Sequence, residues 1–421
     1  GQRAVSMSAY PEAIKQYEEA LKTLLILPEN LSRNEKEIDL QLALGRAYQA
    51  TVGFAHEKVG QAYHRAWTLC QSGQDAVNQI TTLQLLVSYY ANIADFKTAE
   101  TMLNLVEEKG EELVNVPTEF SPQPHLGHAY LDSLYGKHQS VVEHCIQAIN
   151  LYERISHHTS GERTGVEAGL FSNGWMGLHI NWLGYPDKAK THIQALQKIA
   201  KGYNSKLYSR DALWFSAWIT LELQDWEAAK KYTEDLLALT IKEGYFFYEA
   251  AAWGFKGSLL FREKKHSEAI KSIQKGLDMF YQTGSIASQT VWLQDLAKAY
   301  CAANLVDEGL TVIAKAEQIE QETGEARYKS TLQRIKGDLH QLKGDETAAE
   351  YAYYHAIDIA KTDGTKLLEL EAVKRLVQLW VDQGKADQGY PILKEVYNWF
   401  TEGFDTPMLI EAKNLLEKIY S

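Results

Sequence analysis

A pattern that returns every 40 residues between about Trp175 and Phe400 constrains the fold of this chain more than any other feature. Each unit has a small residue, an apolar or aromatic residue 3 positions later, a small residue at 12, an apolar residue at 16, and a small or apolar residue at 19. A fixed period of this length with two helical patterns per unit is typical of a helical-repeat array. The six units start at Gly177, Ala217, Gly257, Ala297, Gly337 and Val377.

These residue types indicate close packing within pairs of helices. We expect the small residue of the first helix to face the small residue of the second, because only small side chains let two helix axes approach closely. The residues at positions 3 and 16 would then fill the space between one pair and the next. Stacking buries the apolar face that each pair leaves open, and the array forms one continuous core.

The spacing resembles that of the tetratricopeptide repeat, which carries Gly or Ala and a nearby Tyr in its first helix, then Ala, an aromatic residue and Ala in its second. The unit here has 40 residues, whereas the family's has about 34, and the terminal Pro of the family pattern is missing from all six units. The resemblance implies an all-α fold, a right-handed α-α superhelix of tetratricopeptide-like helix pairs. An amphipathic segment at about Thr406–Tyr420, with Asp405 or Thr406 as its N-cap, is expected to close it as a capping helix.

We expect one repeat domain over residues 1–421, with about ten helix pairs, because an array grows without the size limit of a compact core. Two segments interrupt it: a loop at 116–124, where three prolines prevent a helix, and an insertion at 155–165. The insertion is either on the binding face or a tolerated surface loop. Ala13, Tyr17 and Ala20 have the second-helix pattern, and counting back 12 positions reaches Gly1. The first pair is therefore expected to be truncated and the chain to be an excised part of a larger protein; a natural start with an irregular cap is the alternative.

Composition excludes several classes of partner. The formal net charge is −12 and no basic run occurs, which disfavours nucleic acid, because phosphate binding needs clustered Lys and Arg. No apolar stretch is long enough to span a membrane and no signal peptide opens the chain. Cys70, Cys145 and Cys301 are far apart and odd in number, which is typical of a reducing compartment. We therefore expect a cytoplasmic protein.

Motifs that carry chemistry are missing from the sequence. There is no GxxxxGK[ST] loop, no strand followed by GxGxxG and no GxSxG elbow, so the chain is predicted to be non-enzymatic and to need no cofactor. Histidines gather between His125 and His158, but neither HExxH nor CxxC accompanies them, so surface or packing roles are preferred to a metal site. A hydrolase that uses these histidines is a third, weaker hypothesis, because no nucleophile motif goes with them. The residues concerned are His125, His128, His138, His144, His157 and His158.

Three longer segments carry a second resemblance: Glu37–Cys70, Gly165–Lys190 and the ending WFTEGFDTPMLIEAKNLLEKIYS (Trp399–Ser421). They are similar to the C-terminal repeat region of large bacterial signalling proteins. Those proteins join a class III adenylate/guanylate cyclase or a Ser/Thr kinase to an AAA/STAND-type ATPase and then to such an array. The resemblance implies a sensor or interaction module, with the upstream ATPase or cyclase region of the same protein as a possible partner.

In the tetratricopeptide family the first helix of each pair lines a concave groove, at offsets of about −6, −3, +1, +4 and +5 from its small residue. Carried over to the middle repeats, that rule gives a groove with central aromatics and a few charges, as a peptide partner would need. The alternative is that these aromatics form core between repeats. The candidate groove residues are Tyr130, Phe171, Asn181, Trp182, Asp211, Trp214, Trp218, Glu222, Phe261 and Arg262. Toward the C-terminus the same offsets give Gln294, Lys298, Arg334, Asp338, Glu371, Lys374 and Asp382, which we expect to form a solvated face.

Two functions fit these observations. The first is a non-enzymatic protein–protein interaction or sensor module that binds a peptide segment or the neighbouring ATPase domain in its groove. The second is a small-molecule receptor, because the array of the maltose-responsive transcriptional activator, attached to a STAND ATPase, is similar in its roughly 40-residue units. An open groove would favour the first function, and an enclosed pocket among the aromatics would favour the second.

Overall fold

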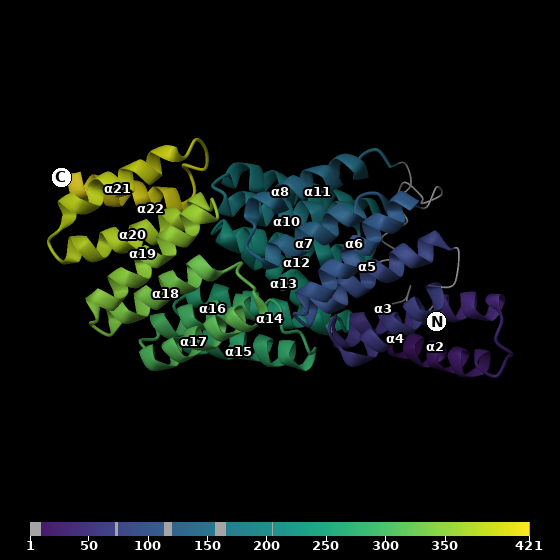
Figure 1. The fold of residues 1–421 in the computed structure, drawn as a ribbon. Helices are drawn as coiled ribbons and strands as arrows, with labels where there is room; N and C mark the ends of the chain where they lie inside the picture. The colour runs from purple at the N-terminus through teal and green to yellow at the C-terminus, as the bar shows by residue number, and fades with distance from the viewer. Residues whose placement is uncertain (1–9, 72–74, 113–119, 156–165, 204, 421) are drawn as a thin grey trace.

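The computed structural model describes residues 10–71, 75–112, 120–155, 166–203 and 205–420 (Figure 1). In these ranges the chain forms 20 helices and no strands, and 83% of it is helical, which confirms the all-α prediction. The helices are α2 (Tyr10–Leu24), α3 (Leu31–Val52), α4 (Glu57–Cys70), α5 (Ala76–Asn92), α6 (Phe96–Glu112), α7 (Gln123–Leu134), α8 (His138–Tyr152), α10 (Ala168–Trp182), α11 (Pro186–Tyr203), α12 (Lys206–Glu222), α13 (Trp226–Glu243), α14 (Phe246–Arg262), α15 (His266–Gln282), α16 (Gln289–Ala302), α17 (Val306–Thr323), α18 (Lys329–Leu342), α19 (Glu346–Thr362), α20 (Lys366–Asp382), α21 (Ala386–Trp399) and α22 (Pro407–Tyr420).

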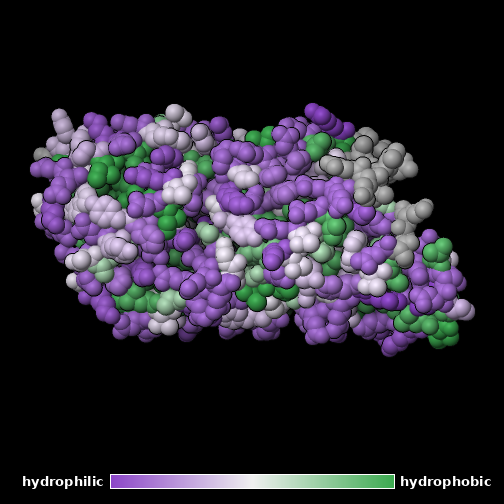
Figure 2. All heavy atoms as spheres, in the orientation of Figure 1, coloured by the Kyte–Doolittle hydropathy of each residue, from purple (hydrophilic) through white to green (hydrophobic). Residues whose placement is uncertain are grey.

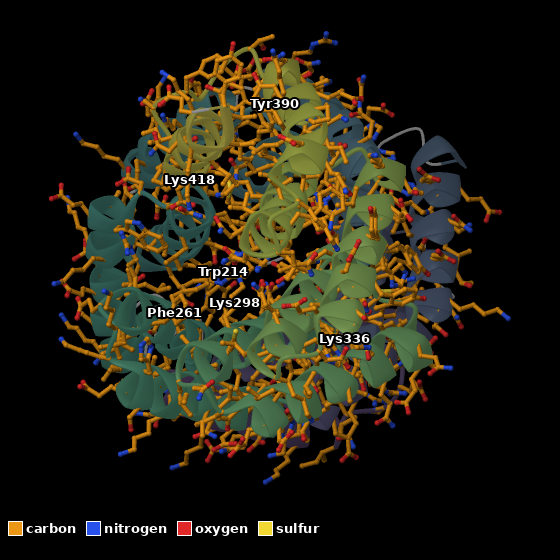
Figure 3. The ribbon with its side chains drawn as sticks, turned by 90° about the vertical axis from the view of Figure 1, so that its left-hand side faces the viewer. Trp214, Phe261, Lys298, Lys336, Tyr390 and Lys418 are labelled. Carbon is orange, nitrogen blue, oxygen red and sulfur yellow. The ribbon has the colours of Figure 1, made fainter. Side chains whose placement is uncertain are left out.

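Between α2 and α22 these helices form consecutive antiparallel pairs, from α3 with α4 to α20 with α21. The first helices of neighbouring pairs also touch one another, as α10, α12, α14, α16 and α18 do in turn. They therefore form the inner wall of the superhelix, and the second helices form the outer one. Figure 3, which looks along the molecule, shows the helices arranged as a ring, with Trp214 and Lys298 near its centre.

Close packing within a pair depends on a missing side chain. A Cβ on Gly257 would lie 2.3 Å from Cγ1 of Ile273, and one on Gly337 would lie 2.5 Å from Cε1 of Tyr353. In these two units the large residue at position 16 thus fills the space over the glycine of its own pair, whereas over Gly177 the nearest side chain is Ile219 of the next pair. The prediction that position 16 lies between pairs is therefore wrong for these units, whereas position 12 does face the glycine, since the carbonyl oxygen of Ala269 would lie 3.0 Å from a Cβ on Gly257. The geometry differs because a bulky side chain can only enter this interface where the facing residue has no side chain.

All six regular units end their first helix in the same way. The residue seven positions after the small one has a left-handed backbone, with φ between 57° and 103°. The next N–H then donates back to the carbonyl of position 3, as from Tyr185 to Ile180 and from Asp345 to His340, both at 3.0 Å. This is the Schellman motif, which satisfies carbonyls left free at a helix end. The left-handed residues are Gly184, Gln224, Lys264, Asn304, Gly344 and Gly384.

Segments from successive turns of the superhelix bond to each other. The amides of Ile286 and Ala326 donate to the carbonyls of Asn92 (2.9 Å) and Leu134 (2.8 Å). Farther along, the amide of Asp187 donates to Oε1 of Glu402 at 2.9 Å. Loops that follow a pair thus dock on turns about 200 residues earlier in the sequence, and α3 touches α14 as α10 touches α20. The coil is therefore tight, and its inner helices enclose the space along its axis.

The C-terminal helix α22 covers the last pair, as predicted. Met408, Leu409 and Ala412 are buried in the same core cluster as α20 and α21, and Thr406 Oγ1 donates to the carbonyl of Gly403 just before the helix. At the other end of the molecule Leu25, Ile26, Leu27 and Leu31 are exposed, and Figure 2 shows hydrophobic surface at the end where α2 and α3 lie. No helix in the described ranges is both long and apolar enough to cross a membrane.

The two predicted interruptions fall largely outside the described residues, which exclude 1–9, 113–119 and 156–165. The boundary of the proline loop differs from the prediction, because α7 begins at Gln123 and includes Pro124. In the first turn of a helix a proline removes no intrahelical hydrogen bond, so it is tolerated there. Neither the missing part of the first pair nor His157 and His158 can be placed.

Candidate functional site

A cavity of about 130 Å³ lies inside the superhelix. Its lining comes mainly from the inner helices α3, α5, α7, α10, α12, α14 and α16, with one residue from the loop before α18. Ten of its lining residues are aromatic: Phe54, Tyr130, Phe171, Trp175, Trp214, Trp218, Phe247, Tyr248, Phe280 and Trp292. The cavity is comparable in size to the roughly 150 Å³ of an engineered apolar cavity that holds benzene. It therefore has room for one aromatic ring or one branched side chain.

The aromatic side chains hold one another in place. The ring of Trp175 lies 6.3 Å from that of Trp214 and 6.0 Å from that of Trp218, both edge-to-face. Tyr130 stacks on Trp175 at 5.7 Å, and Tyr248 meets Trp214 edge-to-face at 5.5 Å. Such pairs each contribute about 0.5–1.5 kcal/mol beyond the burial of their area. The cavity wall is therefore formed before any ligand arrives.

Arg327 brings a positive charge to this apolar cavity. It lies in the loop between α17 and α18, which docks through the bond from Ala326 to Leu134. Nε of Arg327 donates to the carbonyl of Ser133 at 3.0 Å, and the guanidinium carbon lies 5.1 Å from the ring centre of Trp175. The side chain is 2% exposed, yet Nη1 and Nη2 have no hydrogen-bond partner.

The acidic residue nearest in sequence does not form an ion pair with Arg327. Glu325 instead accepts hydrogen bonds from the amide of Ser288 (3.0 Å) and from Oγ1 of Thr290 (2.8 Å). Burial raises the pKa of Glu325, and the charge of Arg327 acts in the opposite direction. No carboxylate in the described part of the chain lies within 4.0 Å of the Arg327 nitrogens, although buried charges are usually paired.

Other polar atoms on the cavity also have no partner. Neither the oxygen nor the nitrogen of the Gln84 side-chain amide makes a hydrogen bond, and the indole N–H groups of Trp214 and Trp292 are equally unpaired. An unpaired buried polar group costs about 1–3 kcal/mol. Together with Arg327, these atoms give the cavity one acceptor and several donors for a ligand.

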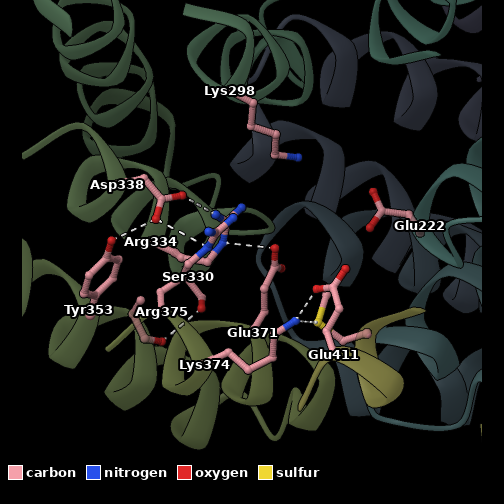
Figure 4. Close-up of polar contacts among 12 residues, drawn as sticks. Glu222, Lys298, Ser330, Arg334, Asp338, Tyr353, Glu371, Lys374, Arg375 and Glu411 are labelled. Atoms are coloured by element: carbon pink, nitrogen blue, oxygen red, sulfur yellow. Dashed lines mark hydrogen bonds and ion pairs between the residues drawn. The ribbon is translucent and has the colours of Figure 1, made fainter. Parts of the chain in front are cut away.

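A network of charged side chains lies farther toward the C-terminal end of the interior (Figure 4). Arg334 pairs with Asp338 at 2.8 Å and with Glu371 at 3.3 Å, and Arg375 lies 3.5 Å from Asp338. Although burial acts to raise the pKa of Glu371, that pKa is lowered because Arg334 and other cations face it. The expected solvated face is wrong for Arg334 and Gln294, which are 4% and 2% exposed, whereas Asp382 is exposed. The tight coil encloses residues that an open groove would leave in water.

The ten candidate residues separate into groups. Tyr130, Phe171, Trp214 and Trp218 line the cavity. Trp182 donates from Nε1 to Glu222 at 2.9 Å, outside the cavity lining, and burial raises the pKa of Glu222.

The remaining four lie elsewhere. Asn181 is fully buried, with neither amide atom paired. Asp211 is buried and accepts a hydrogen bond from Arg210 at 2.7 Å. The guanidinium of Arg210 packs on the ring of Tyr248. Phe261 is half-buried against His266, and Arg262 is exposed over Trp226. Both stand at the end of α14, where the helix runs out toward its turn.

Sequence reasoning missed several cavity residues. Gln84 lies 3 positions before Val87, so the offset rule would have found it if applied beyond the middle repeats. Trp175 and Trp292 fall between the offsets of the rule. Arg327 lies in a loop, to which the rule does not apply.

The histidines form two separate contacts. His125 and His144 approach through their Nδ1 atoms at 3.1 Å, with His128 stacked on His144 and bonded to Glu107. His138 and His179 form a second, buried pair. Among the described residues, no group of three or more His, Cys, Asp or Glu side chains is placed to hold a metal ion.

Comparison with known proteins identifies the fold and no family. No family model matches the sequence, and no curated protein matches it. A Rap protein complexed with competence and sporulation factor is similar in structure, with a TM-score of 0.62 and 12% identity over 93% of this chain and 100% of that one. The quorum sensor NprR from B. thuringiensis has a TM-score of 0.48 at 14% identity (86% and 99% covered). Yeast Tom70 has 0.41 at 14% (100% and 94%).

The likeness to the Rap protein covers nearly the whole of both chains and confirms the tetratricopeptide-like α-α superhelix. At 12% sequence identity this likeness shows a shared fold and not a shared function. The resemblance to the repeat region of cyclase- and ATPase-linked signalling proteins stays a prediction.

Proposed function

We propose that this chain is a non-enzymatic sensor or interaction module that binds a peptide segment in its aromatic cavity. The observation that carries the proposal is the set of unpaired polar atoms of Gln84 and Arg327 on a cavity whose largest side chains are aromatic. A cavity of apolar walls with a few convergent polar groups is the usual form of a binding site. The Rap protein, which has the same fold, is itself complexed with competence and sporulation factor.

A peptide fits these atoms better than an apolar molecule does. The Gln84 amide offers one acceptor and one donor side, which matches the N–H and C=O of a peptide group. The segment could belong to the neighbouring ATPase domain that the second resemblance implies, or to a separate protein. With no disulfide among Cys70, Cys145 and Cys301, a cytoplasmic location remains part of the proposal.

The buried serine–histidine contact does not argue for catalysis. Ser133 Oγ lies 2.8 Å from Nε2 of His179, and His179 lies 3.0 Å from His138. Ser133 and His179 are both fully buried, so a substrate could not reach the hydroxyl. Burial lowers the pKa of His179 well below its ordinary value, which keeps the ring neutral in its structural role.

The size of the cavity supports a second candidate, a receptor for a small molecule of the inducer type. A volume of about 130 Å³ holds one ring or one branched side chain, whether that group is free or belongs to a peptide. The two candidates place the same chemical group at the same position. They differ in whether a peptide backbone adjoins it.

A cavity-filling substitution tests binding at this position. Pools of random tetrapeptides, half of them free acids and half C-terminal amides, would be titrated while tryptophan fluorescence and the Tm are recorded. We expect a saturable change in the wild type and its loss in Ala251→Leu, because Ala251 lines the cavity and the added methyl groups would occupy it. Ala314→Leu, on the exposed face of α17, is the matched control. Binding that survives Ala251→Leu unchanged would place the ligand elsewhere and overturn the proposal.

A further inference from the structure

Arg327 is the charged group that the cavity presents to a ligand, and among the described residues it forms no ion pair within 4.0 Å, although its charge acts on the buried Glu325. Nη1 and Nη2 are buried and unpaired, and Glu325 bonds to Ser288 and Thr290 instead. Removing a guanidinium from water without an anion costs several kcal/mol. The ring faces of Trp175 and Trp218, 5.1 and 5.9 Å from the guanidinium carbon, offset only part of this cost. Nη1 and Nη2 are thus left open to an anion that the described residues do not place against them.

We propose, resting on the function above, that the cavity binds a carboxylate carried on an apolar group, and that Arg327 holds this carboxylate through Nη1 and Nη2. Two parallel N–H donors match the two oxygens of a carboxylate. The described cavity lining contains no second cation, so a phosphate, which carries up to two charges, would be left partly uncompensated. The aromatic rings receive the apolar group that adjoins the carboxylate.

Two kinds of molecule carry this chemistry. One is the C-terminal residue of a peptide that ends in an aromatic or branched side chain, with its last peptide group against Gln84. The other is a free carboxylic acid of the same size. In both, the volume of about 130 Å³ limits the apolar group to a single ring or one branched chain.

Binding of matched acids and amides to two proteins tests the inference. Tetrapeptide pools with Phe, Trp or Leu fixed at the last position would be prepared as free acids and as C-terminal amides. Phenylacetate and 3-phenylpropionate, with their amides, form the small-molecule arm. Each would be titrated by calorimetry against the wild type and Arg327→Gln. Lys298→Gln is the control, because Lys298 is an interior cation paired with Asp295 at 3.1 Å and is not part of the cavity lining.

We expect the wild type to bind acids at least about 30-fold more tightly than amides, the ordinary effect of losing one partner of a buried charge pair. In Arg327→Gln the ratio should fall to near one, and Lys298→Gln should keep it. The variant should fold, because the Ser133 carbonyl also accepts from the amide of Gly136 at 3.3 Å. Its Tm without ligand would be recorded beside that of the wild type to show that the variant is folded.

The outcomes separate this inference from the proposed function. Preference for peptide acids supports both, and binding of phenylacetate alone with the same Arg327 dependence supports the carboxylate and assigns the small-molecule source. Amides that bind as tightly as acids would overturn the carboxylate inference and leave the peptide site intact. If no pool binds the wild type, the proposed function itself fails. Should Arg327→Gln not fold, the acid–amide ratio of the wild type still decides the question.

Discussion

Around Arg327 the charges of individual side chains are set by burial. The Nδ1 atoms of His138 and His179 lie 3.0 Å apart. The other ring nitrogen of His179 is hydrogen-bonded to the hydroxyl of Ser133. The carbonyl of Ser133 accepts a hydrogen bond from Nε of Arg327. Burial, aided by the charge of Arg327, lowers the pKa of His138 to about 3. The histidines therefore stay neutral at neutral pH, and the guanidinium is the only fixed charge of this group.

This arrangement predicts acid destabilisation that depends on His138. Because its folded pKa is below the unfolded value of about 6.5, the unfolded state binds more protons. Stability is then full above pH 6.5 and is lost as the pH falls toward 3. The free energy of unfolding falls by up to about 1.4 kcal/mol per pH unit for each buried ring that must stay neutral in the folded state. His138→Gln can keep a hydrogen bond to His179 but cannot be protonated. Urea denaturation at pH 7, 6, 5 and 4 should therefore show a smaller fall in its free energy of unfolding with decreasing pH, by the contribution of one proton.

His128→Gln is the control for that series, because His128 lies 28% exposed beside Glu107. It should leave the acid slope close to that of the wild type. Equal slopes for the wild type and His138→Gln would contradict the prediction and indicate that other groups govern acid unfolding.

At the level of the helix pair, the repeated turn is the element that the sequence specifies most directly. Its left-handed residue lies seven positions after the small residue in all six units. Gly384 has φ of 73°, and a Cβ there would meet nothing within 4 Å. Gly384→Ala should therefore destabilise by about 1 kcal/mol through backbone strain alone. Thermal and urea denaturation would measure the change.

Gly110 in α6 is the matched control, because a Cβ there also meets nothing within 4 Å but the backbone is helical. Gly110→Ala should be neutral or stabilise by up to about 1 kcal/mol. A similar loss at both positions would mean that Gly384 is needed for something other than its φ.

The period predicted the pairs and their turns, and the amphipathic pattern after Thr406 predicted the capping helix, because these depend on residues close in sequence. The offsets from the small residue also selected Tyr130, Phe171, Trp214 and Trp218, which lie on the inner helices and line the cavity. Arg327 could not be predicted in this way. Its position depends on the bond from Ala326 to Leu134, which joins residues 192 positions apart, whereas a repeat pattern specifies only contacts between neighbouring units.

At the scale of the whole molecule, one loop both joins successive turns of the superhelix and contributes a charged residue to the cavity. Residues 324–328 dock on the end of α7 through Ala326 and also present Arg327 to the cavity. Successive turns also contact each other where the side chain of Glu402 accepts hydrogen bonds from the amides of Asp187 and Lys188. A ligand held by Arg327 would therefore strengthen contact between turns that are distant in sequence.

That coupling predicts where ligand binding will slow amide hydrogen exchange. With the tightest peptide acid of the screen at 100 times its Kd, exchange through local opening should slow by up to about 100-fold in residues 324–328 and in the facing residues 134–137. Residues 364–366, the corresponding connection one repeat later, serve as the internal control and should change much less. Uniform slowing in both loops would reflect general stabilisation of the array. No change in 324–328 while the peptide is bound would mean that Arg327 does not hold it, because a bound carboxylate must restrict the loop that carries the guanidinium.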